Sequence, residues 1–395
     1  MEIKGNIKEK EYFGINKNVF LLSIVSFITD VSSEMIMPIL PMFISSLGGS
    51  SVIIGLVGGL RDSIASILKV ISGYYSDRTG KKKIFVLLGY FTSSIFKLLL
   101  SFSKTWLGIL SFAVLERVGK GIRTAPRDAI IADSTVGKRG KGFGIHRAFD
   151  TLGAIIGSIT VFILYWFLKY GFNEIIFIAA IISFFAVIPI YFVKEPKSNK
   201  SYLSLRLSLK SLSKPLKLFI LVSAIFTLAN FSYMFFILRA QEYFVGKLSV
   251  GIPILLYVLF NIFYASFAIP FGILSDKIGR KKVIISGYFL YGLTSFGFAY
   301  LHSLSWFIVL FALYGISYAI IQGNQRAYVS DLSSGNIRGT ALGTFHTVIG
   351  LASLPSSLIA GCLWQINPSI TFIYGGILAF ISAVIFISYI FKYKL

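Results

Sequence analysis

Long apolar runs recur along nearly the whole of this 395-residue chain. A membrane helix needs about 20 mostly apolar residues to cross about 30 Å of hydrocarbon. Twelve runs reach that length, which indicates an all-α membrane protein. The helices are predicted at 18–46, 52–75, 84–103, 106–131, 141–168 and 172–193, and at 217–238, 249–274, 282–301, 304–328, 340–363 and 370–391.

A polar connection near the middle of the chain separates these helices into two sets of six. It reads KEPKSNKSYLSLRLSLKSLSKPLK and holds a single acid among many basic residues, which is typical of a cytoplasmic linker. A segment lying on anionic lipid is the alternative. We predict a tail at 1–17, a six-helix bundle at 18–193, a linker at 194–216 and a second six-helix bundle at 217–392.

The same short motif follows the second helix of each set. GYYSDRTGKKK starts at residue 73 and GILSDKIGRKK at residue 272, so the two halves have the same build. In each copy, the first glycine allows close helix packing and the second a tight turn, and the aspartate is expected just past the helix end. There it could accept hydrogen bonds from another helix's N-terminus as a breakable latch, unless the motif is only a topological anchor. The candidate gate residues are Gly73, Asp77, Arg78, Gly80 and Lys81, and Gly272, Asp276, Lys277, Gly279 and Arg280.

The net charge of +22 could suggest a nucleic-acid partner, but the positions of the charges indicate otherwise. With the twelve spans laid out, 25 Lys and Arg residues fall on the side of the termini and the linker, against four on the other side. This positive-inside bias predicts a multi-pass protein of the cell membrane with both termini in the cytoplasm, and no nucleic-acid partner. With 55% hydrophobic residues, the chain has the lipid bilayer as its surroundings.

The repeated pattern G-x-x-x-D-R/K-x-G-R/K-K, found in both halves of a twelve-helix chain, resembles the signature loop of the major facilitator superfamily. The resemblance covers essentially the whole chain. It implies two pseudo-symmetric six-helix bundles around a central cavity, with alternating access by rocking of the bundles. It also implies that Asp77 belongs to a cytoplasmic gate contact that favours the outward-facing state.

Nine basic residues remain at or near membrane depth after the loops and ends are assigned. A charge at the bilayer centre costs about 2.5 kcal/mol or more, so such residues normally face a cavity or one another. All but one of them lie in the N-terminal half. They are Arg61, Lys69, Lys97, Arg117, Lys120, Arg123, Arg127, Arg147 and Arg326.

Two acids in the first predicted helix are candidates for proton binding. Asp30 and Glu34 are four residues apart and share one helix face, ahead of the MPILP segment with its two prolines. Two neighbouring carboxylates in a low-dielectric cavity raise each other's proton affinity. The alternative is that both are permanently neutralised by basic neighbours such as Arg61 or Arg117.

The fourth predicted helix contains ERVGKGIRTAPRDAIIAD, with seven charged residues in eighteen. On a regular helix Glu116, Lys120 and Arg123 lie on one stripe. RVGKG resembles the fourth-helix R-x-x-x-G motif of proton-driven facilitators, and the resemblance ties Arg117 to proton transfer. Because Pro126 lacks a backbone donor, we expect the helix to bend or end there.

The cations of this helix have two interpretations. They either pair with the acids of the first, second and fifth helices, or form an anion-binding surface for a carboxylate or phosphate. Both interpretations place the charged side chains along a cavity. The candidate proton-coupling and cavity residues are Asp30, Glu34, Arg61, Asp62, Glu116, Arg117, Lys120, Arg123 and Asp150.

The fifth predicted helix reads HRAFDTLGAIIGS, and its glycines Gly153 and Gly157 allow another helix to approach. This segment resembles the exporters' G-x-x-x-G-P motif, with Ser158 in place of the proline. The C-terminal half offers mainly neutral amides, which suit either substrate contact or hydrogen bonds between helices. The substrate candidates are Asn230, Asn261, Gln322, Asn324 and Arg326.

Together these features predict a secondary active transporter of small molecules, most similar to the twelve-helix proton-coupled drug and metabolite exporters. Proton-coupled import of an organic anion and a non-transporting receptor or scaffold on the same fold are the alternatives. The sequence has no phosphate-binding loop and no His/Cys/Asp cluster with metal spacing, so we expect no enzyme activity, cofactor or metal site. We expect a monomer that interacts with its substrate, protons and the bilayer.

Overall fold

The computed structural model describes residues 11–12, 15–135, 139–195, 212–333 and 338–393. These residues are almost entirely helical, apart from two short antiparallel strands, β1 (Glu11–Tyr12) and β2 (Ile15–Asn16). The first half contains α1 (Lys17–Ile36), α2 (Leu40–Ser46), α3 (Ser51–Thr79), α4 (Lys82–Ser101), α5 (Trp106–Ser134), α6 (Arg139–Trp166), α7 (Phe172–Phe185) and α8 (Ile188–Tyr191). The second half contains α10 (Lys214–Ala229), α11 (Met234–Gln241), α12 (Leu248–Ile278), α13 (Arg280–Tyr300), α14 (Leu304–Asp331), α15 (Arg338–Ile366) and α16 (Pro368–Tyr393).

Within the described residues, eleven segments are long and apolar enough to cross a membrane. The twelfth is α5, whose 29 residues exceed the roughly 20 that a crossing needs but which carries the charged stripe of the fourth predicted helix. Twelve spans in two sets of six confirm the predicted fold class. The exact boundaries of the predicted tail, bundles and linker stay predictions.

Three of the predicted spans consist of two helices each. The first breaks between α1 and α2, where Pro38 and Pro41 remove backbone donors. The sixth breaks between α7 and α8, whose first turn holds Pro189. The seventh breaks between α10 and α11, with Asn230 at the C-cap of α10. These breaks leave backbone groups of the span interiors available to partners other than their own helix.

The fourth span does not end at Pro126. α5 runs through Pro126 without interruption and ends only at Ser134. Membrane helices tolerate an interior proline because neighbouring helices and side chains can satisfy the freed backbone groups. Arg127 and Asp128 therefore belong to the same helix as Arg117, within the predicted span 106–131.

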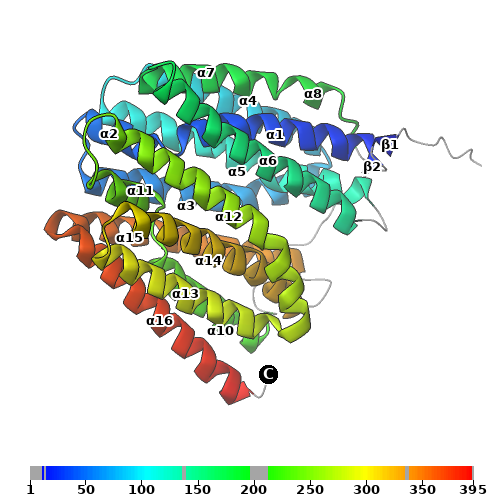
Figure 1. Cartoon of the computed structure of the whole chain (residues 1–395). Coiled ribbons are helices and arrows are strands. Elements are labelled where there is room, and N and C mark those ends of the chain that lie inside the picture. The colour runs from blue at the N-terminus through cyan, green and yellow to red at the C-terminus, as the bar shows by residue number, and fades with distance from the viewer. Residues whose placement is uncertain (1–10, 13–14, 136–138, 196–211, 334–337, 394–395) are drawn as a thin grey trace, which may run out of the picture.

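The two halves lie against each other along the helices, as Figure 1 shows, with the N-terminal half coloured blue to green and the C-terminal half green to red. Most contacts between them join α3 to α15 and α6 to α12. We call the end where α1 begins and α8 ends the linker end. The far end is the opposite one, where α2 and α11 end and contact each other.

Glycines form the seam between α3 and α15. A Cβ atom added to Gly55 would lie 2.1 Å from the backbone oxygen of Ser357, and one on Gly59 would lie 2.8 Å from the Cα atom of Leu354. Gly361 meets the start of α3 in the same way, at 2.6 Å. Because no side chain separates the two helices at these points, their backbones touch along the contact between the halves.

Glycines also bring α6 against α1 within the N-terminal half. A Cβ atom on Gly153 would lie 2.6 Å from the backbone oxygen of Phe27, and one on Gly157 would lie 2.3 Å from that of Val31. The helix that the fifth-span glycines admit is therefore α1. This contact fixes the position of α1, which carries Asp30 and Glu34.

Candidate transport site

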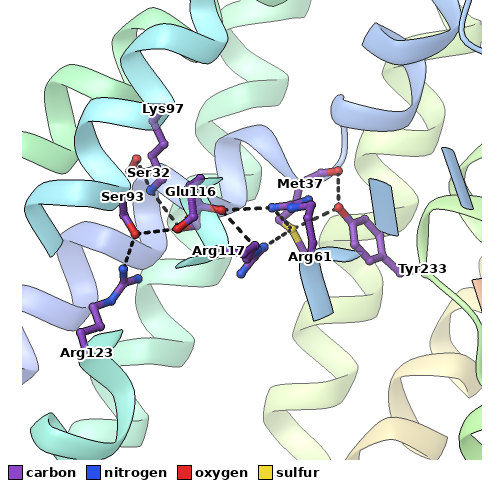
Figure 2. Close-up of polar contacts among 10 residues, drawn as sticks. Ser32, Met37, Arg61, Ser93, Lys97, Glu116, Arg117, Arg123 and Tyr233 are labelled. Atoms are coloured by element: carbon purple, nitrogen blue, oxygen red, sulfur yellow. Dashed lines mark hydrogen bonds and ion pairs between the residues drawn. The ribbon is translucent and has the colours of Figure 1, made fainter. Parts of the chain in front are cut away.

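A buried ionic cluster occupies the N-terminal half, where α3 and α5 meet (Figure 2). The Glu116 carboxylate lies 3.2 Å from Arg117 Nε and 3.6 Å from an Arg61 nitrogen. Both guanidinium groups also contact the sulfur of Met37, at the break between α1 and α2. The Tyr233 hydroxyl, from the C-terminal half, donates to the Met37 backbone carbonyl at 3.1 Å. The cluster therefore reaches the other half through Met37.

Two further buried cations, Lys97 and Arg123, lie close to this cluster. Lys97 on α4 donates to the hydroxyls of Ser32 and Ser33, each at 2.9 Å. Arg123 donates to the Ser93 hydroxyl at 2.5 Å, and its guanidinium lies 4.3 Å from the centre of a tyrosine ring on the same helix as Ser93. Hydroxyl groups and an aromatic face replace part of the water that these cations lose on burial.

For Arg117, the structure shows a different ion-pair partner from the acids of the first, second and fifth predicted helices. Asp30, Glu34, Asp62 and Asp150 were the acids expected to neutralise them, yet none of the four forms an ion pair with Arg117 among the described residues. Glu116 takes that place, because the side chain of the next residue, Arg117, turns back onto it. Lys120, on the same stripe as Glu116, is exposed and has no ion pair in the described part of the chain.

Glu34 on α1 connects the two halves of the protein. Its carboxylate accepts hydrogen bonds from the Tyr257 hydroxyl at 2.8 Å and from the Asn261 amide at 3.4 Å, both on α12. The Asn261 amide also donates to Ser158 on α6 at 3.1 Å. One carboxylate thus joins α1 to α12, and Asn261 extends the network to α6. Ser158, which stands where the exporter motif has proline, supplies a hydroxyl to this network.

Asp30 and Asp62 lie on either side of this junction. Asp30 is half-buried and interacts electrostatically with Lys120 and Asp150, without an ion pair among the described residues. Asp62 is exposed, and its charge interacts with Arg117 and with Tyr318 of the other half. Both carboxylates are therefore accessible to water or to a bound molecule.

A second polar contact between the halves lies nearer the linker end. Asp150 on α6 is 3.6 Å from His146 and 3.9 Å from Arg147. The Arg147 guanidinium donates to the Tyr264 hydroxyl on α12 and lies 5.5 Å from the centre of its ring. Sequence reasoning named neither Tyr257 nor Tyr264, because nothing distinguishes these two among 21 tyrosines.

The substrate candidates of the C-terminal half are used in different ways. The Asn324 amide is buried and donates to a carbonyl one turn back in α14, at 2.8 Å. Asn230 is half-buried at the break between α10 and α11, and Gln322 is half-buried on α14. Arg326 is exposed, and its Nε donates to the Gln322 carbonyl at 3.0 Å. Asn261 alone among these five contacts a carboxylate of the other half within the described residues.

Both copies of the repeated motif form their turns as predicted. Gly80 and Gly279 have φ values of 71° and 97°, which favour glycine. Asp77 and Asp276, however, lie within the last turns of α3 and α12 rather than past the helix ends, because each helix continues to its motif glycine. Asp77 is exposed and has no ion pair with any described residue, whereas Asp276 lies 2.8 Å from Arg280.

The first glycines of the two copies differ. A Cβ atom on Gly73 would lie 3.1 Å from Ala125, but one on Gly272 would meet nothing within 4 Å. Close helix packing at this position is therefore found in the first copy and not in the second. The larger spacing around Gly272 leaves room at the linker end of α12.

In each half, a base just after the motif turn reaches the aspartate at the end of the fourth helix of that half. Lys82 Nζ lies 2.7 Å from Asp133 at the end of α5. Arg280 contacts Asp331 at the end of α14 in the same way. The two halves therefore share a linker-end ion pair that the sequence repeat did not reveal, since the aspartates lie outside the repeated motif.

A cavity of about 370 Å³ opens at the far end, between the ends of α2, α11 and α15. Burial raises the pKa of the Glu242 carboxyl there, although its ion pair with Arg239 at 2.9 Å opposes this. The cavity is lined by Ser45, Ser51, Ile54, Leu238, Gln241, Glu242 and Trp364.

Comparison with known proteins identifies the family. The family model described as Major Facilitator Superfamily matches residues 22–254 and 220–394. The chain belongs to this superfamily. The MFS-type transporter MJ1317 of Methanocaldococcus jannaschii is 61% identical over 386 residues, covering 97% of this chain and 96% of that protein. A shorter match, to the multidrug resistance protein MdtH of Yersinia enterocolitica, is 29% identical over 145 residues, 36% of this chain and 35% of that protein.

Solved structures of the superfamily have the same fold. The nucleoside transporter NupG superposes with a TM-score of 0.77 at 16% identity, covering 95% of this chain and 99% of that one. The POT family transporter PepTSo gives 0.79 at 14% identity, with coverage of 95% and 98%. At such identities the likeness concerns the fold alone. Membership of the superfamily makes the chain a multi-pass membrane transporter and not an enzyme, as predicted.

Proposed function

We propose that the protein exports a small drug-like or metabolite substrate in exchange for protons, by alternating access of its two halves. The observation that carries this proposal is the Glu34 junction, where one carboxylate of α1 accepts hydrogen bonds from Tyr257 and Asn261 of α12. Hydrogen bonds to an ionised carboxylate are roughly twice as strong as neutral ones. Binding a proton at Glu34 would therefore weaken a contact that holds the halves together.

The same carboxylate is suited to both protons and substrate. Asp30, one turn away on the same face of α1, is half-buried and without an ion pair among the described residues. A substrate that displaces Tyr257 or Asn261 and donates its own hydrogen bond to Glu34 would keep this carboxylate ionised, so substrate and proton would compete for it. Exchange of protons and substrate in opposite directions requires that Glu34 binds either a proton or the substrate, but not both at once.

One feature supports export, and another supports the proposed orientation of the protein in the membrane. The match to a multidrug resistance protein, although short, falls in the same superfamily. The excess of basic residues on the side of the linker end supports a cytoplasmic linker end. In this proposal both termini lie in the cytoplasm and the protein acts as a monomer in the cell membrane. Substrate would then enter from the linker end, where Arg147 and Arg326 are exposed, and meet the exposed Lys120 halfway along α5.

Flux measurements in proteoliposomes test the coupling. We expect an imposed pH gradient to drive transport of a compound from a panel of lipophilic dyes and organic acids. Glu34→Gln should reduce gradient-driven flux at least tenfold while retaining exchange of labelled for unlabelled compound, because the neutral amide cannot release a proton. Asp30→Asn should give a smaller loss. Glu174→Gln, at an exposed carboxylate of the far end, is the matched control.

Unchanged coupling in both Glu34→Gln and Asp30→Asn removes these residues from the mechanism. Uptake driven by an acidic exterior, instead of efflux, would reverse the direction to symport. No gradient-driven flux of any compound in the wild-type protein would contradict the proposal as a whole.

A further inference from the structure

Four basic side chains from four helices gather where the halves meet, toward the linker end. We call them the interfacial basic cluster: Lys69 on α3, Arg147 on α6, Arg326 on α14 and His346 on α15. The charge of Arg326 interacts with those of Lys69 and Arg147, and His346 interacts with Lys69 and Arg326. Each half thus contributes two members.

The packing of the helices fixes this gathering. α3 and α15 are still in contact at the level of the cluster. A Cβ atom on Gly343 of α15 would lie 3.5 Å from the side chain of Val70, next to Lys69 on α3. On the other pair of helices, the Arg147 guanidinium donates to Tyr264 of α12. The two seams between the halves therefore hold Lys69 and Arg147 near the residues of the opposite half.

The acids nearby are already engaged. Asp128 accepts two hydrogen bonds from Arg127, at 2.9 and 3.1 Å. Asp150 lies between His146 and Arg147, at 3.6 and 3.9 Å. The remaining acid with which Arg147 interacts is Asp30, and Asp30 also interacts electrostatically with Lys120 on α5.

Lys69 and Arg326 are consequently the unbalanced members. Neither has an ion pair among the described residues, and the Nε of Arg326 donates only to a carbonyl of its own helix within that part of the chain. Among the described residues, the one carboxylate that acts on both cations is Asp128, which is already paired with Arg127, so Lys69 and Arg326 repel each other and a bound anion would reduce that repulsion.

The cluster is open to solvent rather than to lipid. Arg326 is exposed and 51% of the Arg147 side chain is accessible, while Lys69 and His346 are half-buried. The electrostatic neighbours of Arg326 include Tyr264 of α12 in its own half and residues of α3, α5 and α6 in the other half, so its exposed guanidinium faces the space between the halves. A lipid-facing guanidinium would lack those neighbours.

We propose that the interfacial basic cluster binds the anionic group, a carboxylate or phosphate, of the transported substrate. This inference rests on the proposed transport function and assigns its substrate class. The planar fork of Arg326 can take two oxygens, Lys69 supplies a point charge, and His346 can donate one more hydrogen bond. An anion bound by residues of both halves would connect the halves, as a substrate does when it is transported by alternating access. The cations beside Glu116 are not part of this site, because they are already paired with that carboxylate within the N-terminal half.

Binding to purified protein in lipid nanodiscs tests the assignment without any flux. The probes are inorganic phosphate and benzoate, titrated at constant ionic strength with chloride as the balancing anion, and ethidium as a cationic comparison. We expect saturable binding of at least one anion, and no competition by chloride. Preference for phosphate or for benzoate then distinguishes the two anionic groups.

Substitutions locate the binding site. Lys69→Gln and Arg326→Gln should each weaken anion affinity at least tenfold, whereas Arg326→Lys should retain part of it. Lys104→Gln, at an exposed lysine of the far end, should leave affinity unchanged. Variants are compared only when they elute as the wild type does, and Arg326→Lys provides the answer if the glutamine variants do not fold.

The results separate this inference from the proton-coupling proposal. No saturable anion binding by the wild type, or equal binding by Lys69→Gln and Arg326→Gln, overturns the anion site even if Glu34→Gln abolishes gradient-driven flux. Anion binding that depends on the cluster, together with flux that ignores the pH gradient, supports the site and contradicts proton exchange.

Discussion

The two halves share a fold, but different interactions stabilise the interior of each half. The N-terminal half buries Glu116, Arg61 and Arg117 in one cluster, each 5% exposed or less. The C-terminal half buries stacked rings instead, such as the Phe236–Tyr314 pair with ring centres 4.1 Å apart. The buried cation described in that half is Arg239, which lies at the far end and donates to backbone carbonyls as well as to Glu242.

This difference shows how one architecture divides its tasks. A buried ionic cluster depends on the presence of every partner, so a proton or ligand that changes one charge affects the whole cluster. An aromatic core has no such dependence and holds its shape through close packing. The N-terminal half is thus the responsive partner, and the C-terminal half presents Tyr257, Asn261 and Tyr264 from a stiff support.

The largest expected effect comes from removing the central carboxylate. Glu116→Gln leaves the Arg61 and Arg117 guanidinium groups buried without their shared anion. We expect the free energy of unfolding to fall by about 3–5 kcal/mol, the usual cost of breaking a buried pair. Unfolding of the solubilised protein by sodium dodecyl sulfate measures it, with Glu174→Gln as the exposed control.

The double variant Glu116→Gln with Arg61→Gln should regain part of this stability, because it removes one of the two uncompensated cations. A loss below about 1 kcal/mol in the single variant, typical of an exposed pair, would show that the cluster is not the stabilising feature of this half.

A polar contact in the aromatic half should matter less. Gln325 donates to the Tyr288 hydroxyl at 2.8 Å, and both side chains are buried. Gln325→Leu leaves a buried hydroxyl without this partner and should cost about 1–3 kcal/mol in the same assay. Removing both polar groups, with Tyr288→Phe added, should restore stability to near the wild-type value. A double variant worse than the single one would contradict the view that apolar packing carries this half.

The smallest effects are expected at the linker-end ion pairs. Arg280 and Asp331 are 24% and 53% exposed, so Arg280→Gln should cost at most about 1 kcal/mol and lose its effect at high salt. Lys82 is only 5% exposed, so Lys82→Gln should cost more than Arg280→Gln. If Lys82→Gln and Arg280→Gln cost the same stability in melting experiments at two salt concentrations, the linker-end ion pairs of the two halves do not differ in strength.

The sequence was sufficient for the fold because the lengths of apolar runs and the motif repeat report directly on membrane crossing and on duplication. It also located the charged positions of the site. It could not give their partners, since the direction in which a side chain points depends on helix rotation. Arg117 turns to Glu116 and Met37, and Glu34 turns to Tyr257 on the other half.

Local rules misplaced two features for the same reason. An interior proline was expected to bend or end α5 at Pro126, and the helix does not end there, because tertiary contacts in a bundle can keep such a helix continuous. Gly272 was expected to lie in close packing, and instead faces open space. Propensity describes one helix at a time, whereas both outcomes depend on neighbours far away in the sequence.

The glycine seam also divides the chain into positions that can vary and positions that cannot. At Gly55 even one added methyl group would overlap a backbone oxygen, which has no alternative rotamer to adopt. Side chains such as Lys120 and Arg326 point into open space and carry no such restriction. The glycines on which the halves pack are therefore different residues from the cations proposed to bind a substrate, so those cations can change over generations while the packing stays the same.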